Sequence, residues 1–180
     1  MTDMENLLYD SSRRCILISV DVLEQKPELF ADMLTLCLEG KYPLAMRAAR
    51  AIQFYCEAHP EKLYPYLDYV LPKFLNTTVD GVKRSFLKLL RDNLDLNKIP
   101  DLGLVLSKCY DWLLSDKEAI AVRVYSFDVI YKIALIEPDL FQELIIVVDQ
   151  LDLDTYPSLR CRVREIKKEF KKRNLNFSDS

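Results

Sequence analysis

Residues 63–90 decide the fold, because two apolar helical patterns follow one another there across a short loop. The first contains Val70-Leu-Pro-Lys-Phe-Leu75 and the second contains Val82-Lys-Arg-Ser-Phe-Leu-Lys-Leu-Leu90. Apolar residues of the first recur at i, i+4, i+7, i+8 and i+11, which is one face of a helix. They are Leu63, Leu67, Val70, Leu71 and Phe74. No stretch of the chain alternates cleanly with period two, so the sequence predicts helices and no strands.

Two spacing signals indicate that this helix pair is repeated along the chain. A Leu stands nine residues before an Arg four times: Leu38/Arg47, Leu75/Arg84, Leu114/Arg123 and Leu153/Arg162. A Pro followed by an acid and a Leu also occurs four times, at Pro27, Pro60, Pro100 and Pro138. Arg14 precedes Pro27 by the same 13 residues as Arg47 precedes Pro60, so a first, shorter repeat begins near Ser11. Together these matches indicate a helical-pair repeat with a period of about 40 residues.

The Pro and the acid are expected to begin the second helix of each pair. Pro has no N–H to lose at the first helical position, and an acid there meets the positive end of the helix dipole. We expect first helices over about 11–25, 43–58, 80–94, 118–136 and 156–172, and second helices over about 28–38, 63–75, 101–114 and 139–151. The register of repeat 138–162 stays open, because its apolar pattern ends at Leu151 while the spacing rule selects Leu153.

The segment 63–93 resembles the HEAT-repeat unit, in which a helix ending in Leu-Pro-x-x-Leu is followed by a turn, Val-Arg and an apolar helix. Segments 38–58 and 114–136 look like the same unit, although Pro72 has no counterpart in them. The resemblance implies an all-α fold, an α-α superhelix (a HEAT/armadillo-like solenoid) of about nine helices in four and a half repeats. We expect an N-terminal tail over 1–10, the solenoid over 11–173 and a C-terminal tail over 174–180.

Composition excludes several classes of protein. The 180 residues carry a net charge of -3 and include only 3 Gly, which argues against a Gly-rich phosphate loop. The N-terminus lacks a secretory pattern, and the longest aliphatic run, 144–148, is far too short to span a membrane. The 5 Cys are scattered without a Cys-x-x-Cys, as is typical of reduced thiols in a cytoplasmic protein. We expect no metal and no cofactor.

A candidate binding surface follows from the resemblance, which implies that second helices line the concave face. Aligning these helices on Leu38, Leu75 and Leu114 places three rows of residues away from the core. The rows are Asp32/Tyr69/Lys108, Leu36/Lys73/Trp112 and Leu29/Tyr66/Val105, and the fourth helix adds Glu143, Ile146 and Gln150 if Leu151 sets its register. Polar-tipped aromatic rings beside charges are typical of a peptide-binding groove. We predict partner contacts at Tyr66, Tyr69, Lys73, Lys108 and Trp112. The alternative is that these aromatic rings only pack between repeats.

Two sets of cations have both a structural and a functional interpretation. The arginines Arg47, Arg84, Arg123 and Arg162 either bind anionic groups or hold neighbouring repeats in register, and we favour the second interpretation. Residues 133–159 hold six acids and no Lys or Arg, whereas residues 160–173 hold eight basic residues and two acids. That basic helix either neutralises its acidic neighbour or binds nucleic acid, as in the DNA-alkylation-repeat glycosylases, which also stack HEAT-like helices. The acidic chain makes nucleic acid the less favoured partner.

Catalysis has little support in the sequence. The single His59 stands before Pro60 and no local Cys/His signature of a catalytic pair is present, and the Gly-Ser-Ser-x-Met-Pro-x-Lys-x-Asn loop of fumarase-type helical lyases is absent. Evidence for an enzyme would be a deep pocket that holds His59 with an acid or a thiol. The sequence therefore favours a non-catalytic protein- or peptide-binding scaffold, with nucleic-acid binding as the alternative. Partner identity and oligomeric state stay open.

Overall fold

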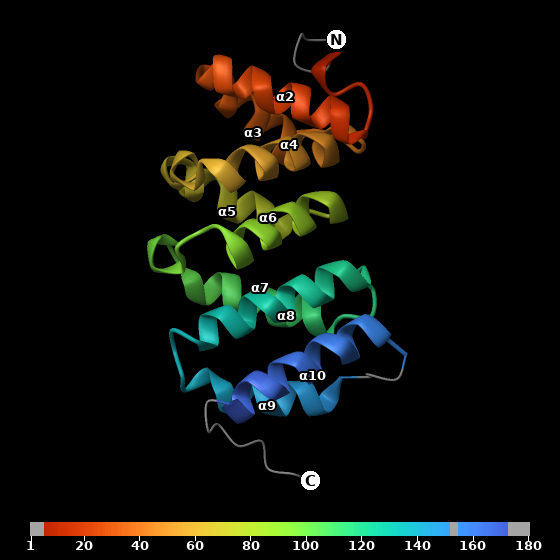
Figure 1. Cartoon of the computed structure of the whole chain (residues 1–180), viewed down its shortest axis with the longest axis vertical. Helices are drawn as coiled ribbons and strands as arrows, with labels where there is room; N and C mark the ends of the chain where they lie inside the picture. Colours follow the sequence, from red (N-terminus) through yellow and green to blue (C-terminus); the bar gives the residue numbers. More distant parts are fainter. Residues whose placement is uncertain (1–5, 152–154, 173–180) are drawn as a thin grey trace. The chain divides into compact units, whose positions relative to one another are not determined.

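The computed structural model describes residues 6–151 and 155–172, and all of its regular structure in those ranges is helical. The α-helices are α2 (Arg13–Gln25), α3 (Phe30–Glu39), α4 (Leu44–Ala58), α5 (Leu67–Asn76), α6 (Asp80–Asp92), α7 (Leu102–Leu114), α8 (Ile120–Ala134), α9 (Leu140–Gln150) and α10 (Pro157–Lys172). Short 3-10 helices are η1 (Pro27–Leu29), η2 (Pro60–Lys62), η3 (Tyr64–Tyr66) and η4 (Leu96–Lys98). The predicted all-α fold of paired helices is confirmed, and Figure 1 shows the pairs in chain order.

The chain divides into two compact units, residues 1–105 and 106–180, and the division falls inside α7. In the first unit α4 packs against α2, α3 and α6, so the first helices α2, α4 and α6 lie side by side (Figure 1). The second helices α3 and α5 form a layer against them. Gly81 allows the approach of α6 to α4, because a Cβ at this position would lie 2.2 Å from Cγ of Met46.

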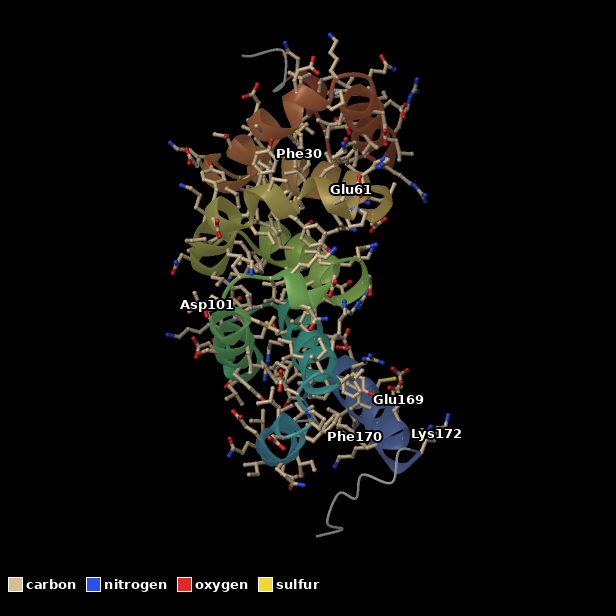
Figure 2. All side chains as sticks on the ribbon, turned by 90° about the vertical axis from the view of Figure 1, so that its left-hand side faces the viewer. Phe30, Glu61, Asp101, Glu169, Phe170 and Lys172 are labelled. Carbon is tan, nitrogen blue, oxygen red and sulfur yellow. The ribbon has the colours of Figure 1, made fainter. Side chains whose placement is uncertain are left out.

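The second unit is organised around α8, which contacts both α9 and α10. Aromatic side chains pack between these helices. The centre of the Phe170 ring lies 4.8 Å from the centre of the Phe141 ring and 5.6 Å from the centre of the Tyr131 ring. Figure 2 shows Phe170 directed into the helices and Lys172 directed outward. The exposed fractions agree, since Phe170 is buried and Lys172 is exposed.

The start of the second helices differs from the sequence expectation. Pro27 and Pro60 begin 3-10 turns, and the α-helices α3 and α5 follow only at Phe30 and Leu67. In the first of these turns the amide of Leu29 donates to the carbonyl of Lys26 over 3.0 Å. The Pro therefore marks the turn into each second helix, where its missing N–H costs nothing, and the α-helix begins after that turn.

Part of the expected N-terminal tail is packed. Leu8 is fully buried, and the carbonyl of Leu7 accepts hydrogen bonds from Sγ of Cys15 at 2.9 Å and Oγ of Ser19 at 3.3 Å. Residues 6–10 thus belong to the folded unit, because the apolar Leu8 covers the open side of α2. The expected tail at 174–180 and the Leu153 of the spacing rule lie outside the described residues.

Candidate protein-binding surface

Helix α5 presents Tyr69 and Lys73 on one face. Its opposite face is apolar and buried, and consists of Leu67, Val70, Leu71, Phe74 and Leu75. Because Tyr69 and Lys73 are four residues apart, they stand one turn apart on the half-exposed side. The ammonium of Lys73 lies 5.0 Å from the centre of the Tyr69 ring, a cation–π distance.

Glu39, at the end of α3, joins this pair into a three-residue cluster. Its Oε1 accepts a hydrogen bond from Oη of Tyr69 at 2.8 Å and an ion-paired hydrogen bond from Nζ of Lys73 at 2.8 Å. Hydrogen bonds from Lys73 and then Tyr69 hold the pKa of Glu39 below its ordinary value. The same bond to Glu39 raises the pKa of Lys73. Both side chains are therefore charged at neutral pH, and the ring of Tyr69 is held in one orientation.

Tyr66 lies just before α5 and is half-buried. Its ring meets the buried Phe30 edge-on, with 5.6 Å between ring centres. Phe30 in turn lies 5.4 Å from the ring of Tyr55 in α4, so Tyr66 is the outermost member of an aromatic series that crosses the unit (Phe30 is labelled in Figure 2). Tyr66 thus combines a packing role with a partly exposed edge.

The expectation that Trp112 faces outward is wrong. Trp112 is 3% exposed, whereas Lys108, whose ammonium lies 5.8 Å from the Trp112 ring centre, is half-exposed. The cause is the alignment on Leu114, which is 44% exposed while Leu113 is fully buried. A register shifted by one residue turns a helix by about 100°, and this shift carries Trp112 into the core.

Correcting that register also changes the other members of the rows. Val105 is buried, and the exposed residues of α7 are Gly103, Leu104, Ser107, Asp111 and Leu114. In α9, the second helix of the fourth pair, the register set by Leu151 places Glu143, Ile146 and Gln150 away from the core. All three residues are exposed, as that register predicts. Asp32 is exposed and Leu36 is half-exposed on α3, and Leu29, the last residue of η1, is also half-exposed.

Three of the four repeated arginines serve structural contacts. Arg47 donates to the carbonyls of Leu8 and Tyr9, each at 2.9 Å. Buried Arg123 donates to the carbonyl of Leu113 at 2.9 Å and pairs with Asp116 at 3.3 Å. The third is Arg162, which pairs with Asp128 of α8 and with Glu165 at 2.9 Å. Arg84 is exposed. These contacts support the register interpretation for Arg47, Arg123 and Arg162.

The basic helix α10 is only partly neutralised. Arg162 is paired as described, and Nζ of Lys167 lies 4.0 Å from Asp149 of α9. Arg164, Lys168 and Lys172 stand at i, i+4 and i+8, and all three are exposed. No ion pair joins them to a carboxylate within the described ranges. Helix α10 thus combines paired cations, Arg162 and Lys167, with an exposed stripe of Arg164, Lys168 and Lys172.

The surroundings of His59 were not foreseen from the sequence. Its Nε2 lies 2.8 Å from Glu24 of α2 and its Nδ1 lies 3.8 Å from Glu61, a residue labelled in Figure 2. The neighbouring Cys56 is buried, and burial, followed by the charge of Glu61, raises its thiol pKa to about 12. A protonated buried thiol is a poor nucleophile, so this cluster acts as a link between α2 and α4. No group of His, Cys, Asp and Glu in the described part of the chain is arranged to hold a metal ion.

Within residues 6–151 and 155–172, no helix has both the length and the apolar composition to cross a bilayer.

Comparison with known proteins gives one match. The family model described as HEAT repeat domain matches residues 4–170, which include both compact units. Neither the curated proteins nor the solved structures contain a match to this chain. The family match agrees with the helix pairs and with the repeated Pro and Arg positions, and it identifies a helical-repeat scaffold. The chain therefore belongs to the HEAT repeat domain family.

Proposed function

We propose that this chain is a non-catalytic scaffold that binds a segment of another protein on the second-helix surface of residues 1–105. The observation that carries the proposal is the cluster of Glu39, Tyr69 and Lys73. The hydroxyl of Tyr69 donates to Glu39 at 2.8 Å, and Glu39 is itself paired with Lys73 at 2.8 Å, so the aromatic ring is held at the surface. Ordering a ring before binding lowers the entropic cost of association. Tyr is also among the residues that contribute most to binding at protein interfaces.

The chemistry of the cluster modifies the role expected for Lys73. Its charge is already compensated by Glu39 at 2.8 Å, so the surface presents a neutral, polar-rimmed aromatic site rather than an isolated cation. Tyr66 supplies a second ring, and exposed Asp32 and Asp68 add acidic groups on α3 and α5. A partner segment with an apolar anchor and a basic flank fits this set of side chains. Lys108 remains a proposed contact of the second unit.

Capture from the native cell extract tests this function. The full-length chain is compared with the double variant Tyr66→Ala/Tyr69→Ala and with Ile18→Ala, which removes an exposed apolar side chain from α2 of the same unit. We expect the wild type and Ile18→Ala to retain the same protein partner and the double variant to lose it. Equal capture by all three proteins, at equal helicity, would refute the proposal. A cytoplasmic location stays part of the proposal and rests on the cysteine pattern of the sequence.

The exposed stripe of Arg164, Lys168 and Lys172 favours nucleic acid as a second candidate partner. Cations spaced by one helical turn can follow a phosphate backbone, and such binding weakens steeply as salt rises. Titration of single- and double-stranded DNA at low salt decides this candidate. Binding that is lost in Lys168→Gln/Lys172→Gln would support it, and absence of binding at low salt would exclude it.

A further inference from the structure

The N-terminal edge of the first unit carries a set of arginines whose hydrogen bonds go to neutral groups. Arg47 donates to the carbonyls of Leu8 and Tyr9 and, at 3.2 Å, to Oγ of Ser11. Arg50 donates to the carbonyl of Ser11 at 3.3 Å. Carbonyl and hydroxyl partners fix a guanidinium in place without cancelling its charge. The loop before α2 is thus fastened to α4 by two guanidinium groups whose hydrogen-bond partners are neutral.

The first turn of α2 adds two more arginines to this edge. Arg13 and Arg14 are exposed and follow the N-cap Ser12, whose Oγ accepts from the amide of Cys15 at 3.2 Å. Helix N-termini favour acidic residues, yet neither α2 nor α4 has an acid in its first turn. None of the four arginines lies within ion-pair distance of a carboxylate in the described part of the chain.

Two exposed tyrosines stand close to these arginines in the chain. Tyr9 is 63% exposed, and its carbonyl is bound by Arg47. Tyr42 is 71% exposed and stands two residues before α4, where the amide of Arg47 donates to the carbonyl of Pro43 at 3.1 Å. Large rings that stay in water lose apolar stabilisation, and an exposed patch of Tyr with Arg is typical of interface hot spots.

Among the described residues 6–14, the acid is Asp10. Its Oδ1 accepts from the amide of Ser12 at 2.6 Å. Hydrogen bonds from Ser12 hold the pKa of Asp10 below its ordinary value, with a smaller contribution from Arg47, so Asp10 is ionised at neutral pH. An anion inside the patch repels a continuous phosphate backbone more than it repels a peptide, whose acidic side chains are spaced apart and can avoid it. The chemistry favours a peptide over a nucleic acid.

We propose that Tyr9, Arg13, Arg14, Tyr42, Arg47 and Arg50 form a second docking surface, which binds an acidic segment of a partner protein. Carboxylates of the segment pair with the guanidinium groups, for which the planar fork of Arg is well suited. An aromatic or aliphatic side chain of the segment packs on the rings of Tyr9 and Tyr42. This surface is separate from the Glu39, Tyr69 and Lys73 cluster and does not depend on it.

Fluorescence anisotropy with a defined probe tests the proposal on the full chain. The probe is a fluorescein-labelled Glu-rich peptide with one central Phe, and its control replaces every Glu by Gln. We expect the acidic peptide to bind more tightly than the neutral one, with an affinity that falls as salt rises. Equal affinity for the two peptides would refute the proposal, as would binding of oligothymidylate without binding of the acidic peptide.

Charge-matched variants locate the contact. Arg13→Gln/Arg14→Gln removes two charges from the edge, while Arg47 and Arg50 are kept because they fasten the loop. Lys26→Gln/Lys62→Gln removes two exposed charges that lie after α2 and after α4. Because charge contacts at an interface rim are lost, we expect the first variant to weaken binding about fivefold or more and the second to leave it unchanged. Equal weakening by both pairs, with unchanged melting temperatures, would mean that net charge alone attracts the peptide and would overturn the proposal.

Discussion

The ion pair between Arg162 and Asp128 should respond very differently to removal of each partner. Asp128 lies in α8 with a side chain that is 3% exposed, whereas the side chain of Arg162 in α10 is 28% exposed. Arg162 also pairs with Glu165 at 2.9 Å. The Arg162→Ala substitution removes this guanidinium from a buried carboxylate, whereas Asp128→Ala leaves a guanidinium that can reach water and still has Glu165.

The magnitudes follow from this unequal burial. Breaking a buried pair by removing one partner costs about 3–5 kcal/mol when the remaining charge stays buried. Loss of a hydrogen bond to a charged group costs about 1.5–3 kcal/mol when the remaining group is solvated. We therefore expect Arg162→Ala to cost at least about 1 kcal/mol more than Asp128→Ala. The double variant should resemble Asp128→Ala, because no charge is then left buried.

Urea unfolding followed by fluorescence measures these differences. The chain has 1 Trp, Trp112, which is buried in α7 and lies in the same unit as both partners. Its emission therefore reports unfolding of the unit that the substitutions change. Equal costs for the two single variants, or a larger cost for Asp128→Ala, would contradict the argument from burial.

Three further predictions concern single sites. Trp112→Ala should destabilise the chain by about 3–5 kcal/mol in urea unfolding followed by circular dichroism, because a buried ring leaves a cavity; a cost below about 1 kcal/mol would contradict its burial. Asp101 has φ 52°, and its Oδ1 accepts from the amide of Leu104 at 3.2 Å. Asp101→Ala should cost about 1–2 kcal/mol in the same assay, since Ala loses the cap and fits the left-handed region poorly, and Asp101→Asn should be nearly neutral. The stability difference between wild type and Glu39→Gln should be full at neutral pH. It should vanish as pH falls through the lowered pKa of Glu39, and it should also vanish as pH rises through the raised pKa of Lys73. Urea midpoints across pH measure it, and a difference independent of pH would count against the Glu39–Lys73 pair.

Helix positions were predictable because the apolar periodicity is long and the turn residues are distinctive. The pattern of α5 predicts its buried face correctly, and the Pro positions mark the turns before the second helices. Exact helix starts were less predictable. Whether the residues after Pro27 or Pro60 form a 3-10 turn or an α-helix depends on packing against neighbouring helices, which a local pattern does not contain.

The candidate surface was predictable on α5 and not on α7, and the reason is the local sequence. Tyr69 and Lys73 stand opposite a run of apolar residues whose register has one solution. In α7, Leu113 and Leu114 are adjacent and identical in hydrophobicity, so either can be the core residue. The spacing to Arg123 selects Leu114, whereas the structure buries Leu113. Nor could Glu39 be assigned to the cluster, because its partners are 30 and 34 positions away in the chain.

The repeated arginines show that recurrence in a sequence does not require a common contact. Arg47 binds carbonyls of the segment before α2, and Arg123 binds a carbonyl at the end of α7 and lies 4.5 Å from the ring centre of Tyr156. Arg162 binds a carboxylate of the preceding first helix. What these positions share is a place near the start of a first helix, where the chain turns and carbonyl groups or acids of the preceding segment need a donor. Arg is retained there because its five donors and long stem suit several different partners. At Arg47 and Arg123 the repeated position thus satisfies carbonyl groups of the preceding segment, whereas at Arg162 it pairs with an acid of α8. The guanidinium of Arg47 differs from the other two because its hydrogen bonds go to neutral groups, which leaves it able to attract an external anion.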